Sequence, residues 1–248
     1  PVPDVCIIGE PSGWSRVTLG YKGRLLVEMD ASQPMAHTAG PDAGIATLAV
    51  SLWQRVSLLA AQYNQGREKV FEQLQPSLRR LETSVDERLH DHIGAQIGIR
   101  LPIGYSVDEL VAQLAAWAAE ETGSSAAHVV IAQGADGSLT ATGEAGVEIK
   151  LSFRGYEPAW REDRSSPVAR AFLGAIRAFD PTVRPSLLTK TGTSDMNVVG
   201  PLWNCPIVAY GPGDSALDHT PNEHISLDEY WKSVQIVEKC LRDLTGFL

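Results

Sequence analysis

The sequence has 248 residues, and its 21 lysines and arginines against 30 aspartates and glutamates give a formal net charge of −9. Because 44% of the residues are hydrophobic, the chain can bury a real core in one or two domains, which excludes a disordered tail and a disulfide mini-protein. The acidic balance argues against a nucleic-acid partner, since phosphate binding needs a surface rich in lysine and arginine. No apolar run approaches the roughly 20 residues that cross a bilayer, so no membrane partner is expected.

The three cysteines, Cys6, Cys205 and Cys240, are widely spaced and form no Cys-x-x-Cys pair. This spacing favours reduced thiols in the cytoplasm over a disulfide framework. The chain opens with Pro-Val-Pro, without an initiator methionine and without the features of a secretory signal. We therefore expect the sequence to start in the middle of a protein.

The first predicted elements in chain order are strands. A short apolar run at residues 5–8 predicts a strand buried on both faces, with Glu10 at its end. Residues 16–28 are rich in β-forming residues and are interrupted by glycines, which predicts a strand or a bent hairpin. A loop is expected to follow at residues 31–40.

The next part of the chain predicts two helices and three strands. A helix from residue 41 to about residue 64 has apolar residues in steps of three and four. After a polar stretch, alternating residues predict a half-buried strand that reaches Arg100, and a capping box at residues 106–109 begins the second helix. Strands at residues 128–132 and 147–153 complete an α+β sandwich in which two helices cover one sheet.

A domain boundary is predicted at residues 154–164, where glycine, proline and charged residues suit a crossing between domains. Beyond it, Ser166 and Pro167 begin an amphipathic helix, and residues 206–210 predict a buried strand. A second capping box at residues 226–229 begins the last helix.

Two polar residues have side chains typical of a hydrolytic metal site. Glu10 and His219 supply a carboxylate and an imidazole, which are ligand types that suit zinc. A solvated loop acid and a turn histidine explain the same pattern equally well. His37, in the loop before the first helix, also belongs to the candidate residues.

Two further features could bind an anion. The hydroxyl-rich loop at residues 191–195 has side chains and backbone N–H groups that can hold a carboxylate, but it is also compatible with a plain turn. Arg100, at the end of its strand, could clamp a carboxylate through two hydrogen bonds or simply lie at the sheet edge. Spacing alone does not choose between these alternatives.

Four groups of residues occur in a fixed order along the whole chain. They are Gly-Glu-Pro-Ser-Gly-Trp at residues 9–14, Thr-Leu-Gly-Tyr-Lys-Gly-Arg-Leu at residues 18–25, Thr-Gly-Thr-Ser-Asp-Met-Asn at residues 191–197, and Tyr-Gly-Pro-Gly-Asp with Asp-His-Thr-Pro at residues 210–214 and 218–221. Together they resemble the co-catalytic zinc amidohydrolases, the family of acetylornithine deacetylase, succinyl-diaminopimelate desuccinylase and glutamate carboxypeptidase. The sequence is most similar to the branch that acts in lysine biosynthesis on an amino-group carrier protein.

The resemblance implies an α/β fold with two domains. A zinc-exopeptidase-like catalytic domain, incomplete here, would comprise residues 1–14 and 156–248. An inserted α+β sandwich at residues 15–155 would be the lid, through which two subunits form a homodimer. The resemblance also implies two zinc ions per complete subunit, with cobalt as a possible replacement.

The resemblance assigns roles to individual residues. Glu10 matches the carboxylate that binds one zinc, and His219 matches the histidine that binds the other. His37 matches the lid histidine that reaches the partner subunit's site and polarises the scissile carbonyl, and Arg100 matches the arginine that grips the substrate carboxylate. The residues that match the substrate-side loop are Thr193 and Ser194.

The family's other metal ligands do not occur in this sequence. Its His-x-Asp motif, its bridging aspartate and its Glu-Glu pair, which holds the general base, all precede the position of Glu10. Catalytic zinc needs about three protein ligands and a water, and Glu10 and His219 would give each metal only one. We therefore expect this chain alone to be the C-terminal part of an enzyme, to retain little zinc and to be inactive.

The predicted function of the complete protein is hydrolysis of an amide, releasing lysine, possibly ornithine, from an acyl or carrier-protein-linked form. The basic residues Arg67, Lys69, Arg79 and Arg80 are candidates for a patch that binds an acidic carrier, although a solvated polar segment explains them as well. Two alternatives remain open. The chain could be a non-catalytic dimerisation or binding fragment, or the enzyme could deacylate acetylornithine or another acyl-amino acid.

Overall fold

The computed structural model describes residues 1–248 apart from residues 38, 40–43, 123–129, 134–136, 144–145 and 247–248. The described chain forms two compact units. Unit 1 contains Pro1–Gly23 and Ala159–Leu248, and unit 2 contains Arg24–Pro158. Unit 2 is therefore inserted in sequence between the two segments of unit 1.

Unit 1 is built on a mixed sheet. Its strands lie in the order β1 (Cys6–Gly9), β11 (Ile207–Tyr210), β2 (Arg16–Tyr21) and β10 (Ser186–Lys190), and the short β9 (Trp160–Arg161) pairs with β2. β1 runs parallel to β11 and β10 runs parallel to β2, whereas β11 and β2 are antiparallel. All four residues of β11 are buried, as expected for a strand with both faces covered.

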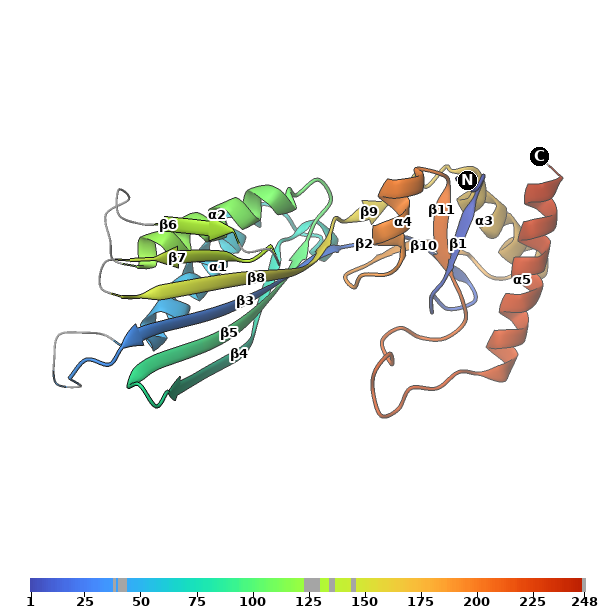
Figure 1. Ribbon diagram of the computed structural model, residues 1–248. Coiled ribbons are helices and arrows are strands. Elements are labelled where there is room, and N and C mark those ends of the chain that lie inside the picture. Colours follow the sequence, from blue (N-terminus) through green and yellow to red (C-terminus); the bar gives the residue numbers. More distant parts are fainter. Residues whose placement is uncertain (38, 40–43, 123–129, 134–136, 144–145, 247–248) are drawn as a thin grey trace. The chain divides into compact units, whose positions relative to one another are not determined.

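Helices cover both faces of the sheet of unit 1 (Figure 1). α3 (Pro167–Phe179) and α5 (Leu227–Thr245) pack together with Val208 and Tyr210, and α4 (Met196–Trp203) packs with Ile207 and Ala209. Successive residues of a strand point to opposite faces, so this alternation along β11 separates the two cores.

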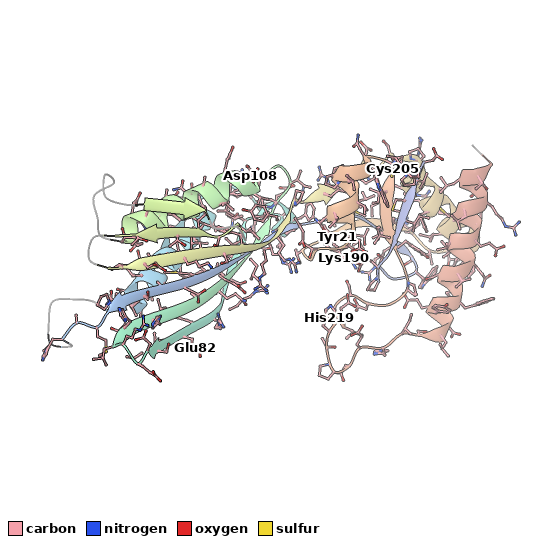
Figure 2. The ribbon with its side chains drawn as sticks, viewed as in Figure 1. Tyr21, Glu82, Asp108, Lys190, Cys205 and His219 are labelled. Atoms are coloured by element: carbon pink, nitrogen blue, oxygen red, sulfur yellow. The ribbon has the colours of Figure 1, made fainter. Side chains whose placement is uncertain are left out.

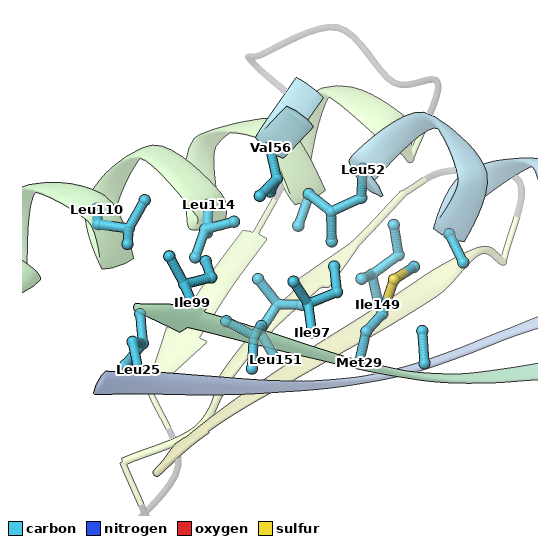
Figure 3. Packing of buried hydrophobic residues seen from close by; sticks show 14 of the residues in the cluster. Leu25, Met29, Leu52, Val56, Ile97, Ile99, Leu110, Leu114, Ile149 and Leu151 are labelled. Atoms are coloured by element: carbon cyan, nitrogen blue, oxygen red, sulfur yellow. The ribbon is translucent and has the colours of Figure 1, made fainter. Parts of the chain in front are cut away.

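Unit 2 is a six-stranded sheet with two helices on one face (Figure 3). The strands lie in the order β4 (Gln75–Val85), β5 (His90–Leu101), β3 (Gly23–Pro34), β8 (Glu148–Glu157), β7 (Leu139–Thr142) and β6 (Val130–Gln133). The helices are α1 (Ala46–Tyr63) and α2 (Val107–Glu121), and Val70–Glu72 form a short 3-10 turn. The core includes Leu52 and Leu114 from the helices and Met29, Ile97 and Ile99 from the sheet. This arrangement confirms the α+β sandwich.

The predicted helix starts at the two capping boxes are confirmed. Ser106 accepts a hydrogen bond from the Glu109 N–H at 3.2 Å, and Ser226 accepts one from the Glu229 N–H at 3.4 Å. The N-cap hydroxyl thus satisfies one of the orphan donors of the first turn. The three cysteines are free, as predicted. In the part of the chain that the structure describes, no helix is long and apolar enough to cross a membrane.

The first predicted domain boundary differs from the division of the described chain into units, whereas the second falls close to it. The sequence placed the first boundary after residue 14, but β2 hydrogen-bonds to β10 and β11, and this pairing makes it part of unit 1 up to Gly23. The second division, after Pro158, falls within the crossing predicted at residues 154–164. Residues 16–28 are accordingly two strands of different sheets, β2 and β3, and not one strand or hairpin.

Several elements were not predicted. β3 continues to Pro34, so the loop expected from residue 31 begins later, and the polar stretch before β5 contains β4. β4 is paired with β5 on one side and is mostly exposed, so it shows no apolar alternation. β7, β10 and α4 were also missed. The start of the first helix at residues 41–42 and the start of the strand at residue 128 lie outside the described residues.

Candidate active site

Glu10 lies directly after β1, half-buried beside other charged groups. Burial raises the pKa of its carboxyl group above the ordinary value, the positive charge of Lys190 opposes this, and the negative charges of Asp195 and Asp218 add to it. These four groups come from three separate loops and one strand end of unit 1. Folding therefore brings the carboxylates of Glu10, Asp195 and Asp218 together with the ammonium group of Lys190, and these three carboxylates are called the acidic cluster below.

Lys190, at the end of β10, is the cation of this cluster, and the sequence did not single it out. Its ammonium group donates a hydrogen bond to the Pro11 carbonyl and lies 5.9 Å from the centre of the Tyr21 ring. Figure 2 shows the labelled Tyr21 and Lys190 next to each other. Burial lowers the pKa of Lys190, and the carboxylates of Asp218 and Glu10 raise it. The positive charge of Lys190 thus offsets part of the negative charge of the acidic cluster.

Thr193 and Ser194 lie in the loop between β10 and α4, and both side chains are half-buried. The loop is anchored by Asn197, a buried residue that the sequence did not single out. Its side-chain oxygen accepts from the Ser194 N–H at 2.9 Å, and its amide nitrogen donates to the Lys22 carbonyl at 3.0 Å. Asn197 therefore ties the predicted substrate-side loop to the end of β2.

Replacing Asn197 with alanine is expected to destabilise unit 1 by about 1–3 kcal/mol, because it removes the partner of buried backbone groups. Urea unfolding of the variant measures the loss. The matched control is Asn222→Ala, which changes an exposed asparagine in the later loop and should shift the free energy of unfolding by no more than about 0.5 kcal/mol. Equal small losses in both variants would show that Asn197 does not anchor the loop.

His219 lies on the long loop between β11 and α5, and its side chain is exposed (Figure 2). Its backbone has a φ of 60°, a left-handed conformation that is uncommon for residues other than glycine. The His219 N–H donates to Glu223 Oε2 at 2.9 Å, which supports this turn. Asp218, the preceding residue, raises the pKa of Glu10.

The described residues by themselves do not form a metal centre. Among them, no group of three or more His, Cys, Asp or Glu side chains is arranged to hold a metal ion. Glu10 and His219 have donor atoms of the type that zinc prefers, but catalytic zinc needs about three protein ligands. These donors fit one ligand position each and do not complete a site.

His37 lies in unit 2, in the segment that follows β3, and its side chain is exposed. The backbone N–H of Ala39 donates to His37 Nδ1 at 3.1 Å. Because Nδ1 is the acceptor, the proton of the neutral ring is on Nε2, which is left as a hydrogen-bond donor.

Arg100 is half-buried near the end of β5 and lines a cavity of 170 Å³ in unit 2. Burial lowers the pKa of its guanidinium group, the charges of Arg24 and Arg79 lower it further, and Glu157 raises it. Two other arginines and one glutamate therefore act on Arg100. A bound anion would relieve this repulsion between like charges.

Three of the four basic residues proposed as a carrier patch differ in what they contact. The guanidinium group of Arg67 lies 3.9 Å from the centre of the Tyr63 ring and donates to the Tyr63 carbonyl, and Lys69 pairs with Glu72 at 3.4 Å. Arg79 instead lines the cavity beside Arg100. Arg67 and Lys69 thus contact residues of their own segment, whereas Arg79 lies at the cavity.

The family is shown by a match along almost the whole chain. Residues 2–243 match the model of peptidase family M20/M25/M40, and the chain belongs to this family. A sequence relative is a [LysW]-lysine hydrolase of Deinococcus radiodurans, which is 39% identical over 247 residues, covering 98% of this chain and 60% of the relative. A putative [LysW]-lysine/[LysW]-ornithine hydrolase of Thermococcus kodakarensis is 35% identical over 99% of this chain and 57% of its own length. The chain thus spans about 60% of the length of these curated relatives.

Solved structures with a similar mixed α/β fold are found at low sequence identity. Aminopeptidase PepT of Bacillus cereus superimposes with a TM-score of 0.68 at 16% identity, over 98% of this chain and 57% of PepT. The metallo-carboxypeptidase Sso-CP2 of Sulfolobus solfataricus gives a TM-score of 0.66 at 16% identity, over 99% of this chain and 64% of its own. At this level of identity the comparison establishes the fold alone.

Proposed function

We propose that the complete protein is a metal-dependent amide hydrolase that releases lysine or ornithine from a carrier-protein-linked form. The observation that carries the proposal is the 39% identity to a [LysW]-lysine hydrolase over 247 residues. A second relative, named as a putative [LysW]-lysine/[LysW]-ornithine hydrolase, supports the same substrate class. Because the chain spans about 60% of these relatives, the activity is proposed for the whole protein.

In this proposal unit 1 belongs to the catalytic domain, and unit 2 is the lid through which two subunits form a homodimer. Glu10 and His219 each supply one ligand to a different zinc ion, with cobalt as a possible replacement. The remaining ligands and the general base come from outside the 248 residues. When bound, zinc would supply Lewis-acid polarisation of the amide and a lowered pKa for a water molecule.

The residues of this chain have distinct proposed roles. His37 donates its Nε2–H to the carbonyl oxygen of the scissile amide in the partner subunit's site, where negative charge develops as the amide is attacked. Arg100 binds the carboxylate of the amino acid through charge-assisted hydrogen bonds. Thr193 and Ser194, held by Asn197, line the substrate side of unit 1.

The proposal is tested by measuring the intact mass and the zinc content of the purified protein, followed by assays. A mass near 26.8 kDa with almost no zinc, and no hydrolysis of any substrate, is expected for the 248 residues alone. The complete protein is expected to bind about two zinc ions and to release lysine from the carrier-linked form faster than from acetyl-lysine.

Three outcomes would count against this proposal. Faster release from acetylornithine than from either lysine substrate would assign the protein to another deacylase of the family. A complete protein that binds zinc but hydrolyses none of these amides would contradict the proposed activity. A complete protein that forms dimers without binding zinc would be a dimerisation or binding module.

A further inference from the structure

Unit 2 has a cavity of 170 Å³ whose lining contains four arginines and no acidic residue. Arg24 comes from β3, Arg79 from β4, Arg100 from β5 and Arg154 from β8. These four strands are neighbours in the sheet, in the order β4-β5-β3-β8. Side chains that are far apart in the sequence therefore meet at one place on the sheet.

Gly98 and Arg100 of the cavity lie on the sheet face opposite the helices, whereas Ile99, which also lines the cavity, belongs to the core. In β5, the core-facing residues Ile97 and Ile99 alternate with Gly98 and Arg100, and successive residues of a strand point to opposite faces. Gly98 and Arg100 are two residues apart on this open face, so their Cα atoms are separated by about 7 Å along the strand.

A β-bulge sets the direction of Arg79. Leu78 pairs with Ile97 and Arg80 pairs with Gln96, so Arg79 is the extra residue of β4 and has no partner in the β5 register. A second register shift lies between Arg24 and Leu26, in the pairing of β3 with β8. Bulges redirect side chains and break the alternation of a strand, and here both lie at residues of the cavity.

Gly98 makes room for the guanidinium group of Arg79. A Cβ at position 98 would lie 2.6 Å from Arg79 Nε and 3.0 Å from its Cζ, so the guanidinium group lies directly over the glycine. Arg79 Nε donates to Ser77 Oγ at 3.4 Å, and Ser77 Oγ donates to the Gly98 carbonyl at 3.2 Å. Arg79 is thus placed beside Arg100 by the bulge and by the missing side chain of Gly98.

Acidic neighbours pair with the two arginines of β3 and β8. Arg24 pairs with Glu157 at 2.8 Å, and Arg154 pairs with Glu28 at 3.2 Å. Arg79 differs from them, because within the described residues it makes no ion pair with a carboxylate. A cationic group placed over a glycine in a cavity without acidic lining residues is a suitable binding group for an anion.

We propose that Arg79 is a second carboxylate-binding residue of this cavity, beside Arg100, and that the ligand carries two carboxylate groups. The inference rests on the proposed function, in which Arg100 binds the carboxylate of the amino acid. It adds that the acyl part of the substrate is itself acidic, so that one carboxylate binds Arg100 and the other binds Arg79. Arg79 then determines specificity by distinguishing an acidic acyl group from a neutral one.

The test compares two small probes that differ in one charge. Glutarate has two carboxylates at pH 7, and monomethyl glutarate has nearly the same size with only one. Isothermal titration of the 248-residue protein at low ionic strength should show that glutarate binds about tenfold more tightly, as expected for one additional charge-assisted interaction. Low salt is needed because exposed charges are screened.

Two variants remove the proposed interaction in different ways. Arg79→Gln deletes the charge, whereas Gly98→Ala keeps the charge but forces the guanidinium group to move. In both variants, the affinity for glutarate should become nearly equal to the affinity for monomethyl glutarate. Arg88→Gln is the matched control, since Arg88 is an exposed arginine between β4 and β5 and does not line the cavity. It should retain the preference for glutarate.

Each outcome bears on a different statement. Equal binding of the two probes by the unmodified protein, or an unchanged preference in Arg79→Gln, would overturn the role of Arg79 while leaving Arg100 and the proposed function intact. Loss of the preference in Arg88→Gln as well would show a diffuse positive surface instead of a site. Binding of neither probe would contradict both Arg79 and the carboxylate role of Arg100. Thermal unfolding of each variant establishes whether it is folded. If Arg79→Gln does not fold, the binding of the two probes by Gly98→Ala tests the proposal.

Discussion

Under the proposed function, in which His37 is an oxyanion donor, replacing it with alanine is expected to lower kcat of the complete protein about 100- to 1,000-fold. The effect should fall on kcat, because the hydrogen bond to the carbonyl oxygen strengthens as negative charge develops in the transition state. The Ala39 N–H fixes Nδ1 as the acceptor and leaves Nε2–H as the donor. Steady-state kinetics with the carrier-linked substrate measures the loss.

The stability of this variant should hardly change. His37 is exposed, so His37→Ala should alter the free energy of unfolding by no more than about 0.5 kcal/mol. His37→Gln is the matched variant, since its side-chain amide can still donate a hydrogen bond and should recover part of kcat. A variant that loses kcat and stability together would indicate a structural role for His37.

Mixed dimers test whether His37 acts in the partner subunit. His37→Ala subunits are mixed with Glu10→Gln subunits, each nearly inactive alone. If the catalytic site combines Glu10 of one subunit with His37 of the other, each mixed dimer has one intact site of two. Half of the dimers are mixed after random assembly, so about a quarter of the unmodified activity should return. No recovery would place His37 and Glu10 in the same subunit's site, or outside the site.

The second large effect is expected at Phe172, in the core of unit 1. Phe172 is fully buried on α3, and its ring lies 4.5 Å from that of Tyr210 on β11. Phe172→Ala removes most of a large apolar side chain and leaves a cavity, which should lower the free energy of unfolding of unit 1 by about 3–5 kcal/mol. Urea unfolding followed by tryptophan fluorescence measures this loss.

A surface residue of the same unit supplies the control for Phe172. Leu202 on α4 is 72% exposed, and Leu202→Ala should change the free energy of unfolding by no more than about 0.5 kcal/mol. If units 1 and 2 unfold in separate transitions, Phe172→Ala should move only the transition of unit 1. A loss below about 1 kcal/mol would contradict the packing of α3 against β11.

The predictions that succeeded rest on short-range chemistry. Ser106 and Ser226 begin helices because an N-cap hydroxyl followed by a glutamate three residues later satisfies orphan N–H groups locally. The apolar run of β11 and the stripe of α3 are strong patterns because each element buries one or both faces. The sequence motifs likewise identified the family, which the match over residues 2–243 confirmed.

The predictions that failed concern long-range pairing. β4 carries no apolar alternation because it is mostly exposed and pairs on one side only, so its pattern is that of a polar loop. β2 belongs to unit 1 because it pairs with β10, about 170 residues later in the chain, and no local pattern encodes this partner. For that reason the boundary expected after residue 14 differs from the division after Gly23.

For the candidate site, the sequence by itself determined the chemical types of the side chains and the order of the motifs that carry Glu10 and His219. Only the tertiary structure brought Lys190, Asp195 and Asp218 close enough to act on the pKa of Glu10, and only the bulge in β4 placed Arg79 beside Arg100. Motifs are read along the chain, whereas charge clusters and cavities depend on strand register and sheet order. These are fixed by pairings between distant segments, so the residues that complete a site are the last that a sequence can reveal.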